Sequence, residues 1–143
     1  VNAHPEFMDK KAKISRILQE EEKLLDIVKL IGSDILPDEQ KLVLETARAI
    51  RQGFLQQNAY HEQDTYVPVK KQYLMMDSIL RFYEKAVKLV SIGVPVSVIR
   101  KSGAFEELIR IKYNIPNDDF GAFEDLNGRL EKTLEEIEAE YRK

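Results

Sequence analysis

Residues 31–64 read IGSDILPDEQKLVLETARAIRQGFLQQNAYHEQD, and this stretch carries the signs of a helical hairpin. An apolar helix end stops at Gly32, a residue that adopts the left-handed conformation at no steric cost. A short acidic turn, Ser33–Glu39, follows it, and a second apolar-periodic segment begins directly afterwards. The sequence therefore predicts two helices joined by an exposed, charged tip.

The second helix of this hairpin is predicted to begin at Pro37 or Asp38 and to run to about Phe54–Gln57. Proline at the first helical position loses no hydrogen bond, because that N–H would be unpaired anyway. Acidic residues in the first turn favour the positive end of the helix dipole. The helix carries one apolar stripe and, beside it, a stripe of smaller residues: Val43, Ala47, Ile50 and Phe54, then Leu42, Thr46, Ala49 and Gly53. We expect the small residues to let a neighbouring backbone approach closely.

Apolar residues at three- and four-residue spacings predict the remaining helices. We expect these at about Pro5–Ile31, Val69–Ile92, Val96–Lys101, Phe105–Tyr113 and Asp119–Tyr141. Three glutamates at 20–22 interrupt the apolar face of the first helix, so part of it is expected to face water. The helix from Val69 carries two apolar stripes and is expected to be the most buried.

The fold class that these patterns predict is all-α. With no convincing strand in the sequence, we expect a helical bundle of about five to six helices with a helix-turn-helix hairpin tip. A length of 143 residues is enough to bury one core, so residues 1–143 are expected to form a single helical domain.

Composition excludes several classes of function. No apolar run approaches the roughly 20 residues that a membrane helix needs, and the first residues do not have the pattern of a signal peptide. The net charge is −3, and residues 117–143 are strongly acidic, which is the opposite of a nucleic-acid-binding surface. A solvated, charge-rich terminal helix explains that acidity. We therefore expect no nucleic-acid partner and no direct membrane insertion.

No complete catalytic or metal site can be recognised in the sequence. There is no GxxxxGK[ST] phosphate loop, no GxGxxG and no HExxH, and the six glycines do not cluster. The two histidines, His4 and His61, are far apart and no cysteine supplements them, so a zinc site is not expected. We predict no catalytic residue and no metal ligand in this chain.

Two interaction surfaces are predicted instead. The first is the turn at Ser33–Glu39, where Ile35 and Leu36 place two large aliphatic side chains at a tip expected to face solvent. The second is the helix exit at Asn58–Asp64. An ordinary hairpin loop is the alternative for the first surface, and a loop with Tyr60 tucked into the core is the alternative for the second.

The sequence resembles the carboxyl-terminal helical domain of the catalytic A subunit of V/A-type rotary ATPases along essentially its whole length. The similarity is strongest in four strings: ILQEEEKLLDIVKLIG (Ile17–Gly32), LPDEQKLVLETARAIR (Leu36–Arg51), FLQQNAYHEQDTY (Phe54–Tyr66) and KQYLMM (Lys71–Met76). The same hairpin occurs in the F-type beta subunit, where the turn reads DELSEED and the second helix ends FLSQPF. Corresponding positions here are Asp34–Gln40 and Phe54–Tyr60.

The chain departs from the family pattern at a few positions. Val67-Pro68 stands where members usually carry Cys-Pro, Gln63 where they often have Glu, and Tyr60 where many have Phe. Aromatic character at position 60 is kept, so the role that the resemblance implies for that residue is retained.

The resemblance implies part of the catalytic subunit of an ion-translocating ATPase or ATP synthase, which couples ATP hydrolysis or synthesis to rotation. The tip would contact the central shaft through Ser33, Asp34, Ile35, Leu36, Pro37, Asp38 and Glu39. The helix exit would help to wall the adenine pocket through Asn58, Ala59 and Tyr60. The acids of the tip are expected to be exposed and to matter less than its shape and stiffness.

Further expectations follow from the family. Its members bind ATP or ADP with Mg at the interface between A and B subunits, and the phosphate loop and catalytic carboxylates lie in a central α/β domain that this sequence lacks. Partners would be the B subunits of the same hexamer and the central shaft subunits. Localisation would be cytoplasmic, peripheral to the membrane. The chain alone is expected to bind no nucleotide tightly and to be inactive as an ATPase.

Two other interpretations compete with this one. A stand-alone helical adaptor could bind a coiled-coil partner without any nucleotide. The chain could also be the homologous region of the non-catalytic B subunit, but the segment FLQQNAY favours the A subunit.

Overall fold

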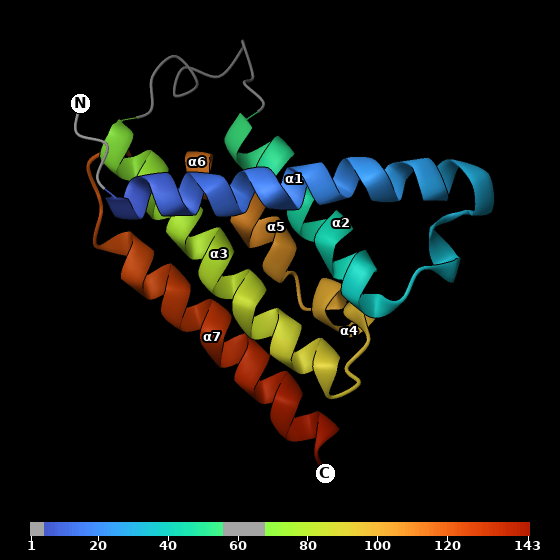
Figure 1. Ribbon diagram of the computed structural model, residues 1–143. Coiled ribbons are helices and arrows are strands. Elements are labelled where there is room, and N and C mark those ends of the chain that lie inside the picture. Colours follow the sequence, from blue (N-terminus) through green and yellow to red (C-terminus); the bar gives the residue numbers. More distant parts are fainter. Residues whose placement is uncertain (1–4, 56–67) are drawn as a thin grey trace.

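The computed structural model describes residues 5–55 and 68–143, and these form an all-α structure (Figure 1). Between the long helices α1 and α2 lies a 3-10 turn, η1, and α2 continues into a π-helical turn, η2. No strand occurs among the described residues, so the predicted fold class is confirmed. The bounds in chain order are α1 (Pro5–Ile31), η1 (Ser33–Ile35), α2 (Asp38–Ile50), η2 (Arg51–Leu55), α3 (Val69–Ser91), α4 (Val96–Lys101), α5 (Ala104–Ile109), α6 (Ile111–Asn114) and α7 (Ala122–Tyr141).

The described part of the chain has seven α-helices, more than the five to six predicted, because one expected helix is divided. The segment predicted as Phe105–Tyr113 breaks at Arg110, whose φ of −92° and ψ of 4° end α5 before α6 begins. In α6 the carbonyl oxygen of Lys112 accepts a hydrogen bond from Nζ of Lys71 on α3. The last helix begins at Ala122 rather than Asp119, because Phe120 and Gly121 form a turn.

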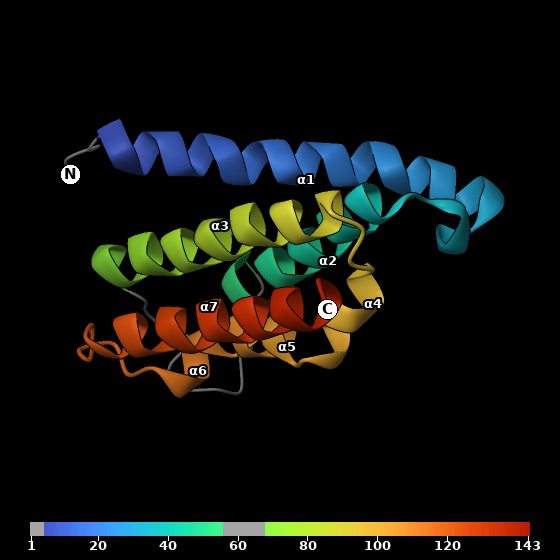
Figure 2. The ribbon, with the colours of Figure 1, turned by 90° about the horizontal axis from the view of Figure 1, so that it is seen from below.

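The helices lie in three layers (Figure 2). In this view α1 covers one side, α2 and α3 form the middle, and α7 lies with α4, α5 and α6 on the other side. The middle layer holds the core: α3 packs against α1, α2 and α7, and it contributes more buried residues than any other helix. The stripe of Met75, Ile79, Phe82, Ala86 and Leu89 is buried, whereas Val69 and Val87 of the other apolar stripe are exposed. The prediction that this helix is the most buried is confirmed.

The carboxyl-terminal part of α1 extends beyond the rest of the bundle (Figures 1 and 2). At a rise of about 1.5 Å per residue, 27 residues make a helix roughly 40 Å long. Its buried positions end at Leu24, and nearly all later residues are exposed. Part of this helix therefore faces water, as expected, but it is the end of the helix rather than the stretch of three glutamates.

A buried lysine ties the start of α3 to the loop after α6. Lys71 is completely inaccessible to solvent, and its Nζ donates hydrogen bonds to the carbonyl oxygens of Lys112 (3.1 Å) and Ile115 and to Oδ1 of Asn117 (2.9 Å). Burial lowers the pKa of the Lys71 ammonium, and the nearby charge of Lys112 lowers it further. The three acceptors offset part of that cost, because hydrogen bonds to a charged donor are stronger than neutral ones.

Lys71→Met should destabilise the fold. The substitution keeps most of the side-chain volume but leaves two buried carbonyls without their donor, and each such group costs about 1–3 kcal/mol. Urea denaturation would show the loss, with Lys85→Met as the control, because Lys85 lies exposed on the same helix. Equal midpoints for the two variants would show that Lys71 is not a structural anchor.

Candidate functional site

The hairpin tip is built from one 3-10 turn and a short extended link. Gly32 has a φ of 85°, which only glycine adopts readily, and it turns the chain away from α1. Ser33–Ile35 form the turn, closed by the hydrogen bond from Leu36 N to Ser33 O at 3.2 Å. Leu36 and Pro37 are then extended, with ψ values of 142° and 157°, and α2 begins at Asp38.

The two aliphatic residues of the tip have different environments. Ile35 is 66% exposed, as expected, whereas Leu36 is only 6% exposed and belongs to the core. The expectation that both side chains face solvent is therefore wrong for Leu36. Ile35 is the last residue of the 3-10 turn and Leu36 is the first extended residue, so the backbone changes direction between them and turns only Leu36 toward the bundle. Leu36 fixes the tip to the bundle, and Ile35 remains available for contact.

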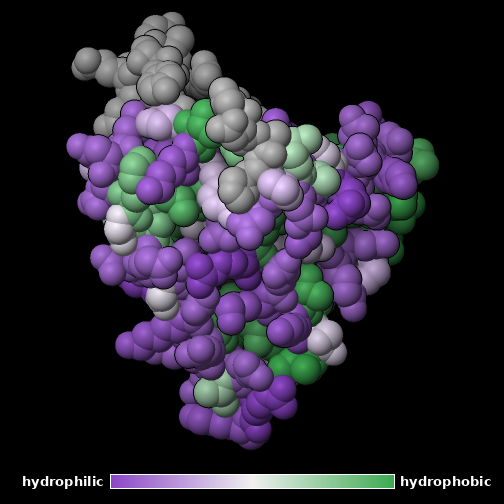
Figure 3. Space-filling model, turned by 60° about the vertical axis from the view of Figure 1, so that its left-hand side comes forward, coloured by the Kyte–Doolittle hydropathy of each residue, from purple (hydrophilic) through white to green (hydrophobic). Residues whose placement is uncertain are grey.

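An apolar stripe on the end of α1 was missed by the sequence analysis. We call it the distal stripe: Ile27, Leu30, Ile31 and Ile35. The first three share one face of α1 because they are spaced three and four residues apart, and Leu30 is 85% exposed. Figure 3 shows one face of the molecule as largely hydrophilic, with hydrophobic atoms in small patches, one of them at the outer edge of the projecting lobe on the right. Ile31 lies two helical turns after the buried Leu24, so periodicity alone places it on the core-facing side of this helix.

Asp38 connects the hairpin to α4. Its Oδ1 accepts a hydrogen bond from the backbone N–H of Val96 at 3.0 Å, so Asp38 caps the amino-terminal end of a different helix. Pro95, the local cap residue of α4, makes no side-chain capping bond. The sequence predicted Asp38 to be an exposed acid of the tip, but it is half-buried and structural. Asp34 and Glu39 are exposed, as expected.

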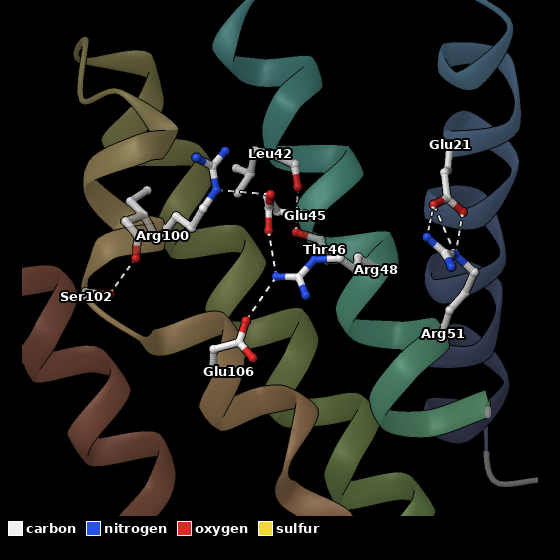
Figure 4. Close-up of polar contacts among 10 residues, drawn as sticks. Glu21, Leu42, Glu45, Thr46, Arg48, Arg51, Arg100, Ser102 and Glu106 are labelled. Carbon is white, nitrogen blue, oxygen red and sulfur yellow. Dashed lines mark hydrogen bonds and ion pairs between the residues drawn. The ribbon is translucent and has the colours of Figure 1, made fainter. Parts of the chain in front are cut away.

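Between the tip and α4 lies a polar cleft of about 410 Å³. Its lining includes Ser33, Asp34 and Lys41 on the hairpin side and Arg100 on α4. At its base Glu45 accepts hydrogen bonds from Arg48 (3.0 Å) and Arg100 (3.2 Å), as Figure 4 shows. This pairing joins α2 to α4, and Arg48 also reaches Glu106 on α5.

The other end of α2 is held from two sides. Arg51 forms a bidentate ion pair with Glu21 of α1, with its Nη2 2.7 Å from Glu21 Oε2 (Figure 4). Gly53 lies against the backbone of α5, where a Cβ atom would be 2.9 Å from the Cα of Ile109. The expected close approach of a backbone to the small-residue stripe is therefore found at this position.

The segment that carries Asn58, Ala59 and Tyr60 lies outside the described residues. Among residues 5–55 and 68–143 there is no group of three or more histidine, cysteine or acidic side chains that could hold a metal ion. None of the helices described is long and apolar enough to cross a membrane.

Asp38→Ala should lower the free energy of unfolding by about 0.5–2 kcal/mol, the usual effect of removing a helix cap. Asp34→Ala is the matched control, because an exposed substitution without special contacts changes stability by about 0.5 kcal/mol or less. Chemical denaturation of both variants tests this assignment. If the two variants unfold at the same midpoint, the bond to Val96 does not contribute to stability.

Comparison with known proteins supports the resemblance seen in the sequence. The model of the family described as the C-terminal domain of V and A type ATP synthase matches residues 1–99. A protein named V-type ATP synthase alpha chain 2 from Clostridium tetani is 47% identical over 142 residues, which cover 99% of this chain and 24% of that protein. The V-type ATP synthase alpha chain of Halothermothrix orenii is 44% identical over 125 residues, which cover 87% of this chain and 21% of that protein.

A third relative gives the same result. The A subunit of the A-type ATP synthase of Staphylothermus marinus is 41% identical over 142 residues, with 96% of this chain and 24% of that protein covered. The chain thus spans about a quarter of the length of the curated relatives that it matches. The matched family model covers more than half of the chain, including the hairpin, η2 and α3. This chain therefore belongs to the family of C-terminal domains of V- and A-type ATP synthases.

Proposed function

We propose that this chain transmits force within a V/A-type ATP synthase, as the helical part of the A (alpha) subunit. One end, the projecting hairpin of α1, η1 and α2, contacts the central shaft. The other end, the exit from α2, faces the nucleotide at the boundary with a B subunit. The assembly that contains it translocates ions and hydrolyses or synthesises ATP, and it works at the cytoplasmic side of the membrane. The relatives' names support this placement, because they are ATP synthase A or alpha chains.

The observation that carries the shaft contact is the overhang of α1 with its unpartnered distal stripe. Leu30, Ile31 and Ile35 are large aliphatic residues that remain exposed on the end of α1 and on η1. Apolar side chains gain roughly 25 cal/mol for each Å² removed from water, so covering them favours binding. Exposed acids such as Asp34 and Glu39 contribute only about 0–1 kcal/mol each to an ion pair. The contact therefore depends mainly on aliphatic packing.

The hairpin is stiff because several contacts hold its tip and its second helix in place. Leu36 is buried at the base of the tip, Asp38 is bonded to α4, and Glu45 is paired with Arg100. Asp38, Glu45 and Arg100 line the polar cleft, and their hydrogen bonds tie the hairpin to α4. A force applied at the overhang then reaches α2 without first bending the turn.

At the nucleotide end, we assign Asn58, Ala59 and Tyr60 to the wall of the adenine pocket, as the resemblance implies. ATP or ADP with Mg supplies the phosphoryl chemistry in the complete enzyme. The sequence has no glycine-rich phosphate loop, so we propose no phosphate or metal contact from this chain. Its share is to place an aromatic ring beside the base, where a stacking contact contributes about 0.5–1.5 kcal/mol.

Replacing Leu30, Ile31 and Ile35 by glutamine should lower the torque of the complete complex while leaving ATP binding normal. The reason is that glutamine keeps the length of the side chain but removes the apolar surface that packs on the shaft. Single-molecule rotation against a viscous load measures the torque directly.

The matched control is the pair Asp34→Ala and Glu39→Ala, which removes exposed acids of the same tip and leaves the cap at Asp38 in place. This pair should rotate with nearly the original torque and with less sensitivity to salt. A stall of the acid variant as severe as that of the aliphatic variant would mean that charge carries the contact.

Tyr60→Ala in the complete enzyme should raise KM for ATP more than it lowers kcat. Contacts to adenine are nearly the same in the ground state and in the transition state, so their loss weakens binding without slowing the chemical step. Tyr60→Phe is the control and should behave almost as the original enzyme. An unchanged KM in a fully assembled Tyr60→Ala complex would remove this residue from the pocket.

A further inference from the structure

The turn η2 is a local departure from α-helical geometry. It occupies Arg51–Leu55 directly after α2 and has π-helical hydrogen bonding, which spans one residue more per turn than the α-helix. Such turns are rare, and they occur frequently at functional sites. One extra residue in a turn rotates everything after it by about 100° relative to a continuous α-helix, because that helix has 3.6 residues per turn. The direction in which the chain leaves α2 is therefore set at η2.

An ion pair anchors the first residue of η2. Glu21 is only 5% exposed, and both of its carboxylate oxygens accept hydrogen bonds from Arg51: Nε lies 3.1 Å from each oxygen and Nη2 lies 2.7 Å from Oε2. A carboxylate withdrawn from water needs such a partner, because removing one member of a buried pair is strongly destabilising. The fork of the guanidinium fixes direction as well as distance. This pair holds η2 against the middle of α1.

Close backbone packing anchors η2 from the opposite side. Gly53 is buried, and a Cβ atom there would lie 2.9 Å from the Cα of Ile109, 3.0 Å from its carbonyl oxygen and 3.1 Å from that of Leu108. These neighbours are backbone atoms of α5 and cannot move aside as a flexible side chain can. Any larger residue would push η2 away from α5.

We propose that Glu21, Arg51 and Gly53 form a clamp whose role is to position the nucleotide-facing segment that follows η2. The three are positioning residues, since they act on the nucleotide only through the chain that leaves η2. The inference rests on the proposed function, because the segment that the clamp would position is the proposed wall of the adenine pocket, Asn58, Ala59 and Tyr60. Arg51 and Gly53 of the clamp lie on η2, which continues α2 away from the tip, so a shift of the clamp changes the geometry between the two ends.

The first test is Gly53→Ala in the complete enzyme. KM for ATP should rise by up to roughly tenfold with a much smaller change in kcat, because a displaced ring loses its stacking contact with the base, and tenfold corresponds to about 1.4 kcal/mol, the upper range of one such contact. Gly128→Ala is the matched control: that glycine lies within α7, and a Cβ atom there would meet nothing within 4 Å. The control should leave KM unchanged and should not weaken the fold, because alanine favours a helix more than glycine does.

The second test is Glu21→Gln, which keeps the shape of the side chain but removes its charge. It should also raise KM for ATP, by a smaller factor than Gly53→Ala, and it should speed amide hydrogen exchange in the peptide that covers 51–55. Glu22→Gln, an exposed neighbour on α1, is the control for the loss of one acid. If Gly53→Ala prevents assembly, this variant alone decides the question.

A double substitution separates the clamp from the adenine wall. If the clamp acts through Tyr60, adding Gly53→Ala to Tyr60→Ala should raise KM no further, because the two changes remove the same contact. Factors that multiply would overturn the inference, and so would an assembled Gly53→Ala enzyme with unchanged KM beside a Tyr60→Ala enzyme with raised KM. If Tyr60→Ala alone leaves KM unchanged, the adenine wall is wrong. The clamp is then tested by amide hydrogen exchange at residues 51–55 alone. Unchanged exchange in Glu21→Gln would show that Glu21 does not hold η2.

Discussion

The close packing of α2 is the constraint on which the rest of the structure depends. Ala47, Ala49 and Ile50 are completely buried, and the helix contacts α1, α3, α4 and α5. Neighbours can surround α2 on so many sides because much of its inward surface consists of small residues, ending with Gly53 against the backbone of α5. A helix packed in this way has little freedom to tilt or slide, since protein interiors are dense and respond to displacement as a unit.

This packing makes α2 a rigid connection between two ends with different chemistry. At its amino-terminal end the chain presents an apolar overhang, with the distal stripe on α1 and η1, and the base of the tip is fixed by Leu36 and Asp38. At its carboxyl-terminal end the chain leaves through η2, held between α1 and α5. In the proposed function, the first end contacts a shaft and the second end faces a nucleotide. Rigid coupling of the two ends is the property that a force-transmitting element requires.

Buried charges supply directional contacts that apolar packing does not. Glu21 with Arg51 and Lys71 with its three oxygen acceptors each place a charged group in the interior, which is costly unless the partners are well aligned. Both clusters lie close to the ends of the undescribed segment 56–67, one just before it at η2 and the other just after it at the start of α3. The positions where the chain enters and leaves this segment are thus defined by hydrogen bonds with strict geometry.

Much of the fold follows from the sequence, because helix periodicity and end signals are local properties. The bounds of α1 and α4 were predicted as observed, α3 to within a residue, and Gly32 and Pro37 marked the tip correctly. The start of α2 was also correct, but α2 ends at Ile50 and continues as η2, whereas the sequence predicted one helix to about Phe54–Gln57. The residues of the tip were also named from sequence, although their exposure was predicted correctly only for some of them. The family could also be recognised from the sequence, because strings such as FLQQNAY can be read without knowing any tertiary contact.

Tertiary structure alone decided which side chains those helices bury. Leu36 and Ile35 are adjacent and similar, and only the change from the 3-10 turn to the extended link makes one core and the other surface. Glu21 is one of three consecutive glutamates. It can be buried because Arg51, 30 positions later in the sequence, forms an ion pair with it. The spacing that marked Ile31 as core is the same spacing that the distal stripe uses in solvent. Periodicity shows which residues share a face, but whether another helix covers that face depends on where the bundle ends, and that is fixed by contacts between residues distant in the chain.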